Sequence, residues 1–298
     1  MAPGRAGAEG NVEIELTPEK WTALLPSFAQ LYSTAGPDGA GVYTHVWRAA
    51  QIADLKTHTF IRKTGEFRNV FRGAVIDSFA LAVQLDQLIR ATMAVAARND
   101  WMYDENAVGG PTDEYVLLAS AAMDDNIPLA FVGGEIQVDA ATVEDIQGIN
   151  INFRNNFDEK RGIRRNRGVM AHNAGEFRIE ISGDMYFSNE VMLRKFMADI
   201  GLKFPFEAGM DLTDIALAVN LAGTGGAGVQ EFKFNFPRVQ FDNVEDPIQG
   251  PGSIMLRFTG AALPDASVDG NFELTAYTTE AASWFAGDAV NNIVVQPL

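Results

Sequence analysis

A glycine-rich segment provides the clearest chemical motif in this sequence. Residues 223–228 read GTGGAG, which satisfies the G-x-G-x-x-G pattern of dinucleotide-binding loops. Such a loop binds pyrophosphate only when it leads into a helix N-terminus, because the free amides of the helix hold the phosphates. Here the following residues, 229–236, alternate apolar and polar side chains as a β-strand does. We therefore predict a β-hairpin tip that binds no nucleotide.

The remaining reactive side chains form no recognisable catalytic or metal-binding set. His45, His58 and His172 stand on different segments, and none has the i, i+4 partner that a metal-binding helix uses. The sequence contains no G-x-S-x-G nucleophile elbow and no cysteine, which excludes disulfides and thiolate ligands. Carboxylate pairs occur, but 39 acidic residues make them expected on solvated faces. We predict no catalytic residues, no metal site, no cofactor and no enzymatic activity.

Composition and charge narrow the class of protein further. The 298 residues carry 39 acidic and 23 basic side chains, a net charge of −16. This charge repels nucleic acid, whose phosphates specific binders neutralise with Lys and Arg. The N-terminal sequence has no apolar signal-peptide region, and no run approaches the roughly 20 apolar residues of a membrane helix. We expect a globular chain that inserts into no membrane and stays in the cytoplasm where it is made until it assembles.

Basic residues gather in one segment, 160–167, which reads KRGIRRNR. Nucleic acid binding is one interpretation, but no aromatic residue is interleaved to stack on bases. We favour contact with acidic loops of a neighbouring subunit, because the rest of the chain is strongly acidic. The candidate inter-subunit contacts are Lys160, Arg161, Arg164, Arg165 and Arg167, and, on the acidic side, Asp104, Glu105, Asp113, Glu114, Asp242, Glu245 and Asp246.

Two distant blocks of the sequence match at one constant spacing. Residues 12–21 align with residues 177–186, and residues 66–97 align with residues 231–262, in both cases at a spacing of 165. Several aligned positions are identical or nearly so in both blocks. A repeat of this length indicates a duplicated domain, because solenoid repeats span about 20–50 residues.

The repeat suggests where the domains divide. We predict a first domain at residues 1–160, which includes a short N-terminal arm at 1–10, and a second domain at 161–298. Asp77 and Asp242 are among the identical pairs of the alignment. A chain with two similar domains suggests an assembly in which the second copy replaces a second subunit.

Most of the strong periodicity is that of β-strands. Phe232, Phe234 and Phe236 share one side of a strand, and beyond Pro237 the apolar positions switch sides. A proline at such a switch indicates a bulge or strand corner. Further strands are predicted over residues 12–16, 79–83, 135–157, 177–181, 215–222 and 254–258.

Helices and loops complete the predicted elements. Apolar residues recur at helical spacing over residues 21–31, although Pro26 should kink that helix. A second helix is predicted over 188–201, ending at a glycine. Long loops at 33–41 and 100–114 are expected to contact neighbours.

One segment of the second half resembles the C-terminal signature of a known family. Residues 232–263 read FKFNFPRVQFDNVEDPIQGPGSIMLRFTGAAL and are similar to the tail tube proteins of long-tailed siphophages. Residues 171–190 are similar to the glycine, strand and helix that begin a domain in that family. The resemblance is close over residues 136–276 and more distant over the first 130 residues. Its pattern is carried by Phe234, Pro237, Arg238, Val239, Pro247, Gly250, Ile254, Ala262 and Leu263.

The resemblance implies a mainly β fold with two tandem β-sandwich or β-barrel domains, each with a short flanking α-helix. It implies a structural virion protein, the major tail tube protein, whose rings stack into a hollow tube that conducts phage DNA into the host. A duplicated domain implies a homotrimer ring with pseudo-hexameric symmetry. The implied partners are further copies of the chain, the tail terminator, distal tail and tape measure proteins, and double-stranded DNA that passes without specific binding. The implied location is the virion tail, after synthesis in the host bacterial cytoplasm.

Two other classes of protein remain open at this point. A capsid decoration or adhesin-like binding module would stay a monomer or simple trimer that never polymerises. A β-rich carbohydrate-active enzyme would need a deep cleft with two carboxylates. Electron microscopy distinguishes these classes from a tube protein, because only the tube protein forms rings and tubes.

Overall fold

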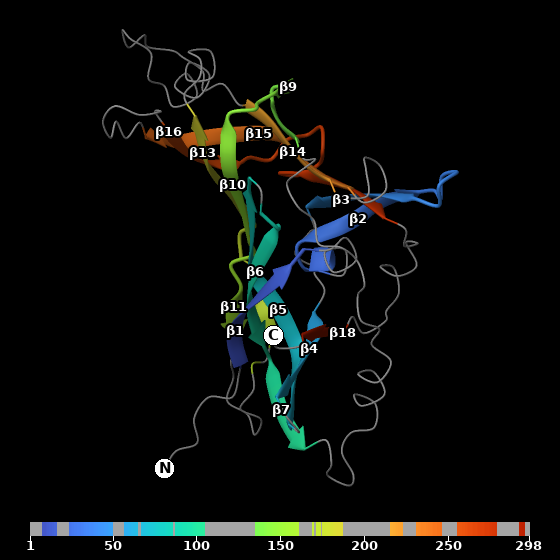
Figure 1. The fold of residues 1–298 in the computed structure, drawn as a ribbon. Coiled ribbons are helices and arrows are strands. Elements are labelled where there is room, and N and C mark those ends of the chain that lie inside the picture. The colour runs from blue at the N-terminus through green and yellow to red at the C-terminus, as the bar shows by residue number, and fades with distance from the viewer. Residues whose placement is uncertain are drawn as a thin grey trace.

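The described part of the chain is built almost entirely from β-strands, so the prediction of a mainly β protein is confirmed (Figure 1). The computed structural model describes residues 8–16, 24–49, 57–64, 67–85, 87–104, 135–160, 169, 171–173, 175–186, 215–222, 231–245, 255–278 and 292–295. The strands are β1 (Ala8–Glu15), β2 (Ala29–Ala35), β3 (Tyr43–Ala49), β4 (His58–Thr64), β5 (Phe67–Gln84), β6 (Arg90–Ala97), β7 (Asn99–Asp104), β8 (Glu135–Val138), β9 (Ala141–Thr142), β10 (Ile146–Arg154), β11 (Asp158–Lys160), β12 (Ala171–Asn173), β13 (Arg178–Tyr186), β14 (Ile215–Ala222), β15 (Glu231–Glu245), β16 (Met255–Ala262), β17 (Glu273–Thr278) and β18 (Asn292–Val295).

One sheet joins the first half of the chain to the second. Its strands follow the order β1, β6, β5, β10, β13, β16, β15, and we call these seven strands the central sheet. Every pairing along this path is antiparallel. β10 lies in the middle and pairs with β5 on one side and β13 on the other. The order β1–β6–β5 in the first half is therefore matched by β13–β16–β15 in the second.

The two long strands, β5 and β15, change partners along their length. The first part of β5 pairs with β4 and β7, and its second part pairs with β6 and β10. β15 pairs first with β14 and β17, and then with β16. Figure 1 shows β4, β5, β7 and β18 forming the lower part of the molecule, while β14, β15 and β16 lie in the upper part.

A β-bulge lies near the middle of each long strand. The extra residue in β5, relative to β4, falls at Arg72 and Gly73, and the extra residue in β15, relative to β14, falls at Pro237 and Arg238. These positions are 165 residues apart. Gly73 adopts a left-handed φ of 59°, which glycine tolerates without steric cost. The bulge at Pro237 is the one predicted from the switch in apolar positions.

A second bulge follows in each long strand, and it also recurs at the same spacing. It lies at Asp77 where β5 pairs with β6, and at Asp242 where β15 pairs with β16. The residue pairs on both sides of the two bulges are equivalent as well. Val75 pairs with Ala96, and the residues 165 positions later, Gln240 and Ala261, pair in the same way.

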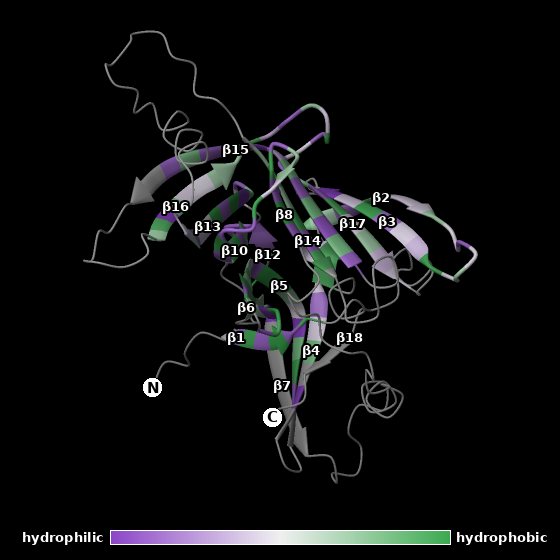
Figure 2. Cartoon of the chain, turned by 45° about the horizontal axis from the view of Figure 1, so that its top comes forward, coloured by the Kyte–Doolittle hydropathy of each residue, from purple (hydrophilic) through white to green (hydrophobic). Residues whose placement is uncertain are grey.

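Aromatic side chains from both halves pack into one core. The ring of Phe153, on the central strand β10, lies 6.3 Å from that of Phe79 and 6.2 Å from that of Phe234. Phe28 stacks on Phe153 at 5.0 Å, and Phe272 meets it edge-on at 5.4 Å. Each such pair contributes about 0.5–1.5 kcal/mol beyond the burial of its area. Figure 2 shows the hydrophobic and hydrophilic residues alternating along the strands that supply this core.

The predicted helix over residues 21–31 is wrong. The described part of this segment forms only a short 3-10 helix, η1 (Leu25–Ser27), and β2 begins at Ala29. Pro26 lacks a backbone donor, and the chain leaves the helical region at Phe28, whose φ is −146°. Packing of the Phe28 ring in the core therefore outweighs the helical spacing. The second predicted helix, at 188–201, lies outside the described residues.

Two predicted loops begin later than expected. β2 extends to Ala35, so the connection to β3 is shorter than the predicted loop at 33–41. β7 occupies the start of the predicted loop at 100–114, and the rest of that segment lies outside the described residues. The predicted division of the chain between residues 160 and 161 falls between β11 and β12, which pair with each other.

The segment around the glycine-rich motif has the predicted strand on each side. β14 and β15 pair antiparallel, with Ala222 opposite Glu231, so residues 223–230 connect the two strands of a hairpin. No helix follows the motif, because β15 begins at Glu231. This arrangement lacks the helix N-terminus that a pyrophosphate site requires.

Candidate assembly surfaces

The central sheet has one buried side and one side that faces solvent. Leu81, Ile151 and Ile181 lie in adjacent strands on the buried side and are at most 1% exposed. One solvent-facing row across the sheet consists of Glu15, Arg90, Ala82, Asn150, Ser182 and Thr259. The neighbouring row consists of Glu13, Thr92, Ala80, Asn152, Glu180, Ala261 and Gln240. We call this side of the sheet the polar face.

Four arginines project from the polar face, and each forms an ion pair with a carboxylate of the same face. The guanidinium of Arg90 lies 3.2 Å from Glu13, and that of Arg257 lies 3.2 Å from Asp184. The other two arginines share one carboxylate, which is described next. Three of the ion pairs run across strands and link β1 to β6, β13 to β16 and β10 to β13, while the fourth, between Arg178 and Glu180, lies within β13.

Glu180 is the carboxylate that holds two arginines. Arg154 and Arg178 lie directly opposite each other on β10 and β13. Two like charges in this position repel each other. Glu180 Oε2 lies 3.0 Å from Arg154 Nη2, and its Oε1 lies 3.5 Å from Arg178 Nε. The Glu180 side chain is 34% exposed, whereas the arginines are 46% and 55% exposed. One carboxylate thus lies within ion-pair distance of two solvent-facing guanidinium groups.

Among the described strands, the central sheet ends in two open edges. β1 pairs only with β6 among the described strands. On the other edge, β14 covers β15 as far as Val239, and residues 240–245 have no described strand on that side. In the first half the corresponding side of β5 is covered by β10, from Ser78 to Gln84. Open edges of this kind pair readily with strands of another chain.

The two bulge aspartates have different surroundings. Asp77 Oδ1 accepts a hydrogen bond from the amide of Phe157 at 2.7 Å, and its carbonyl accepts one from the amide of Asn155 at 2.8 Å. The Asn155 side chain donates to the carbonyls of Ser27 and Ile76. Together these bonds fasten the segment after β10 to the first half of the chain.

Asp242 forms no such attachment. Its side chain is exposed, and no amide in the described part of the chain donates to its carboxylate. The second half thus has the same bulge as the first but lacks the bound segment.

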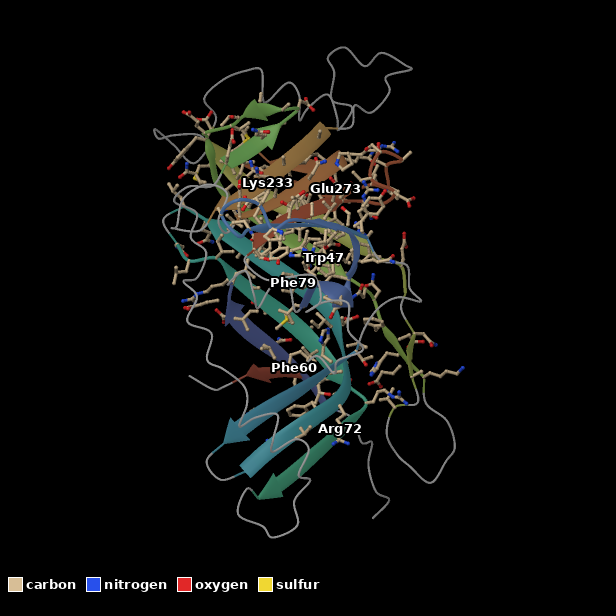
Figure 3. All side chains as sticks on the ribbon, turned by 90° about the vertical axis from the view of Figure 1, so that its right-hand side faces the viewer. Trp47, Phe60, Arg72, Phe79, Lys233 and Glu273 are labelled. Atoms are coloured by element: carbon tan, nitrogen blue, oxygen red, sulfur yellow. The ribbon has the colours of Figure 1, made fainter. Side chains whose placement is uncertain are left out.

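The β2–β3 hairpin projects from the body of the molecule (Figure 1). At its base Arg48 donates two hydrogen bonds to Glu273 Oε2 on β17, at 3.0 and 2.8 Å, and its guanidinium lies 3.8 Å from the centre of the Tyr32 ring. Figure 3 shows Glu273 in the upper sheet with Lys233. At the tip, the amide of Val42 donates to Asp38 and lowers the pKa of that carboxyl. These contacts shape both ends of a hairpin whose outer half is exposed.

Exposed apolar side chains gather at one end of the central sheet. Leu85 and Leu88 lie in the turn between β5 and β6 and are 48% and 43% exposed. Tyr186 lies at the end of β13 and is 39% exposed. The amide of Leu85 bonds to Gln147 and that of Tyr186 bonds to Asp145, so both lie beside the start of β10. We call Leu85, Leu88 and Tyr186 the apolar rim.

The structure describes only some of the predicted inter-subunit contacts. Lys160 is exposed at the end of β11, whose pairing with β12 makes the basic segment the connection between two paired strands. Asp242 is exposed, while the backbones of Asp104 and Glu245 end β7 and β15. The remaining candidates lie outside the described residues: Arg161, Arg164, Arg165, Arg167, Glu105, Asp113, Glu114 and Asp246.

The histidines lie at separate places in the structure. His58 shares a hydrogen bond with Ser27, and burial lowers its pKa to about 4. His45 Nδ1 lies 3.0 Å from Thr34 Oγ1, and the ring of His172 lies against Phe157. Among the described residues no three His, Cys, Asp or Glu side chains gather as a metal ion would require. A helix long and apolar enough to cross a membrane does not occur in the described part of the chain.

The polar face and the shared role of Glu180 were not predicted from the sequence. The alignment of the two halves places Glu180 opposite Glu15, but nothing in it indicates that Glu180 lies beside Arg154. That contact depends on the register between β10 and β13, which are separated by 23 residues of chain. The alternation Asn150, Asn152, Arg154 was the only sequence signal for a polar side at this position.

Comparison with known proteins gives this β-sheet protein a family. No curated protein matches the chain. A family model for phage tail tube proteins matches residues 1–270. The match includes every strand of the central sheet, both bulged strands and the β2–β3 hairpin. The chain belongs to the phage tail tube protein family.

Proposed function

We propose that this protein is the major tail tube protein of a long-tailed siphophage, and that three copies form each ring of a hollow tube that conducts DNA. Membership of the family supports the coarser statement that it is a structural component of the virion tail that assembles into a tube with other tail proteins. The observation that carries the finer proposal is the recurrence of both β-bulges at one spacing in the two halves of the chain.

The recurring bulges support a duplicated tube domain. Two unrelated β-hairpins would share strand order by chance more readily than they would share two bulges and the residue pairs around them. We infer that each half is one ring unit, with the two domains divided near residue 160. Three chains then supply six units. Because the two halves of each chain differ in sequence, the ring has threefold and not sixfold symmetry.

The open edges of the central sheet are the proposed sites of ring closure. Six antiparallel pairings separate β1 from β15, so these edge strands run in the same direction. An antiparallel closure needs one more strand between neighbouring chains, as β10 provides between β5 and β13. About 24 strands, spaced about 4.8 Å and tilted about 40°, enclose a barrel roughly 48 Å across. A barrel of this size leaves an aqueous channel.

Stacking of rings requires contacts at the ends of the barrel. The apolar rim lies at one end of the central sheet and offers hydrophobic contact. The basic segment at 160–167 and the acidic candidates offer ion pairs between chains whose total charge in a ring is 3 × −16, or −48. Such a charge opposes assembly, so local pairing of opposite charges is needed.

The remaining partners follow from the position of a tube within a tail. We propose that the end rings contact the tail terminator and distal tail proteins, and that the tape measure protein and then double-stranded DNA occupy the bore. Synthesis would take place in the host bacterial cytoplasm before assembly into the tail.

Electron microscopy of the purified protein tests this proposal. We expect rings or tubes whose symmetry is threefold, with six similar units around the ring. Mass measurement should give three chains per ring. Six chains per ring would contradict the duplicated domain, and a protein that stays monomeric or forms only simple trimers would favour a decoration or adhesin-like module.

A further inference from the structure

We propose that the polar face is the surface past which duplex DNA moves, and that Glu180 keeps this surface from holding DNA by pairing with both Arg154 and Arg178. This inference rests on the proposed function, because it assumes that the ring encloses DNA. It goes beyond that function in naming the face, its arginines and the residue that controls them.

The position of the polar face supports its assignment to the bore. It belongs to the sheet that runs through both halves of the chain, so it is the surface that ring closure would make continuous. The opposite side of the sheet is buried against the core, so it is closed to a channel. The polar face is therefore the side that remains open to a channel.

The side chains of the polar face suit movement without attachment. Its rows contain short residues such as Ala80, Ala82, Thr92 and Ser182, which leave few protrusions. The two rows hold no aromatic residue on which an exposed base could stack. The four guanidinium groups are then the side chains described for this face that would attract phosphate most strongly.

Unpaired arginines at this face would slow DNA strongly. Each phosphate that a guanidinium neutralises releases counterions, and the resulting affinity accumulates over all contacts. Four arginines per chain make 12 in a three-chain ring, and stacked rings would multiply that number along the bore. The four share three carboxylates, Glu13, Glu180 and Asp184, and Glu15 adds a fourth to the face, so these four arginines and four carboxylates sum to zero charge.

Glu180 has the largest individual effect in this arrangement, because it serves two arginines. Without its charge, Arg154 and Arg178 would face each other as two positive groups, and a phosphate between them would relieve their repulsion. A role in stability alone predicts something different. If Glu180 acted on stability alone, Glu180→Gln would lower the free energy of unfolding by about 0–1 kcal/mol and leave the affinity for DNA unchanged.

The test is binding of a short DNA duplex to purified protein, measured by fluorescence anisotropy over a range of salt concentrations. Wild type should bind weakly, with a shallow salt dependence. Glu180→Gln keeps the shape of the side chain and frees two guanidinium groups. We expect at least tenfold tighter binding at low salt, and a slope of log K against log[salt] that is steeper by about 1.8, from two contacts of about 0.9 each.

Two controls separate charge from altered structure. The triple variant Glu180→Gln, Arg154→Gln, Arg178→Gln should return binding to the wild-type level, because no guanidinium is freed. Glu273→Gln, which removes the partner of Arg48 away from the polar face, should leave DNA binding unchanged. If Glu180→Gln does not fold, Asp184→Asn frees Arg257 alone, and we expect its slope to steepen by about 0.9.

The outcomes for this inference and for the proposed function can be told apart by imaging the same samples. If wild type forms tubes and folded Glu180→Gln gains no affinity for DNA, the inference is wrong while the tube function stands. Strong, salt-dependent DNA binding by wild type would also overturn it. If wild type forms no rings at all, the proposed function fails, whatever the DNA measurement shows.

Discussion

The hairpin of β5 and β6 and the hairpin of β15 and β16 show how far two regions can diverge in sequence while keeping the same backbone. Both hairpins have the same register, and both long strands are bulged at the same two places. At the first bulge, however, one strand uses Gly73 in a left-handed conformation and the other has Pro237. The two hairpins therefore share the same pattern of backbone pairing, while the residues at equivalent positions differ.

One residue pair shows this exchange within the core side of the sheet. Ile76 lies opposite Val95, and the equivalent pair is Phe241 and Gly260. The large Phe241 ring, which meets Phe258 edge-on at 5.5 Å, occurs together with a glycine, whereas the medium-sized Ile76 occurs with a medium-sized valine. A side chain at Gly260 would collide with the backbone of Gln240 and Phe241, so the second half has a glycine where the first half has a valine.

The second bulge has the same backbone shape in both halves, but its aspartate makes different contacts in each. Asp77 fastens residues 155–157 to the first half, whereas Asp242 is exposed on an edge that no described strand covers. The bulge aspartate of the first half is thus hydrogen-bonded within the chain, whereas the bulge aspartate of the second half is exposed at the surface. The comparison teaches that the same backbone bulge can hold an internal contact in one half of a chain and remain exposed in the other half.

The largest expected effect comes from making the second hairpin resemble the first. In Gly260→Val the new Cβ would lie 2.5 Å from the carbonyl oxygen of Gln240, which belongs to the backbone and cannot rotate away. We expect a loss of about 3 kcal/mol in the free energy of unfolding, measured by urea denaturation. The reciprocal variant Val95→Gly should cost only about 1 kcal/mol, through lost packing and added chain freedom. Equal losses would show that the two sites are packed alike.

Acid should destabilise the protein through His58, which is buried in the first half of the chain. Burial lowers the pKa of His58 from 6.5 to about 4, so the unfolded chain takes up a proton below pH 6.5 while the folded chain does not. The free energy of unfolding should therefore fall as pH decreases from 6.5 to 4, by about 2 kcal/mol at pH 5 from this residue. His58→Gln should remove that part of the pH dependence. Parallel urea titrations at pH 7.5 and pH 5 measure it, and identical pH dependence in the two proteins would contradict the role of His58.

The two bulge aspartates provide a matched pair of substitutions. Asp77→Ala removes the acceptor of the Phe157 amide and should lower the free energy of unfolding by about 2 kcal/mol, because the amide is left without a partner. Asp242→Ala should change it by less than about 0.5 kcal/mol, as is usual for an exposed site. Any effect of Asp242→Ala should appear instead in ring formation, measured by sedimentation. Similar losses of stability in both variants would remove the difference between the halves.

The smallest effect on the isolated chain is expected from the basic segment between the halves. Reversing Arg164 and Arg165 to Glu should leave the free energy of unfolding unchanged within about 0.5 kcal/mol. Tube formation should weaken most at low ionic strength and recover partly with salt, because screening reduces repulsion to about 8 Å at physiological ionic strength. Unchanged tube length and yield would mean that the segment is only a solvated surface.

Much of the strand structure was predictable because it depends on local alternation. Phe232, Phe234 and Phe236 are fully buried, as their spacing predicts, and the bulge at Pro237 follows from the switch in apolar positions. The helix over residues 21–31 was predicted wrongly, because Phe28 packs against Phe153, a residue 125 positions away that local spacing does not reveal.

The sequence by itself determined the class of protein: a β-rich, acidic chain with two matching blocks, which belongs to the tail tube family. Only the tertiary structure decided that Asp77 is held and Asp242 is exposed, although the two are identical residues at equivalent positions. It also decided that Glu180 lies between two arginines from different strands. The physical reason is that alternation along a strand sets which side a residue faces, while its neighbours across the sheet depend on strand order and register, which distant parts of the chain determine together.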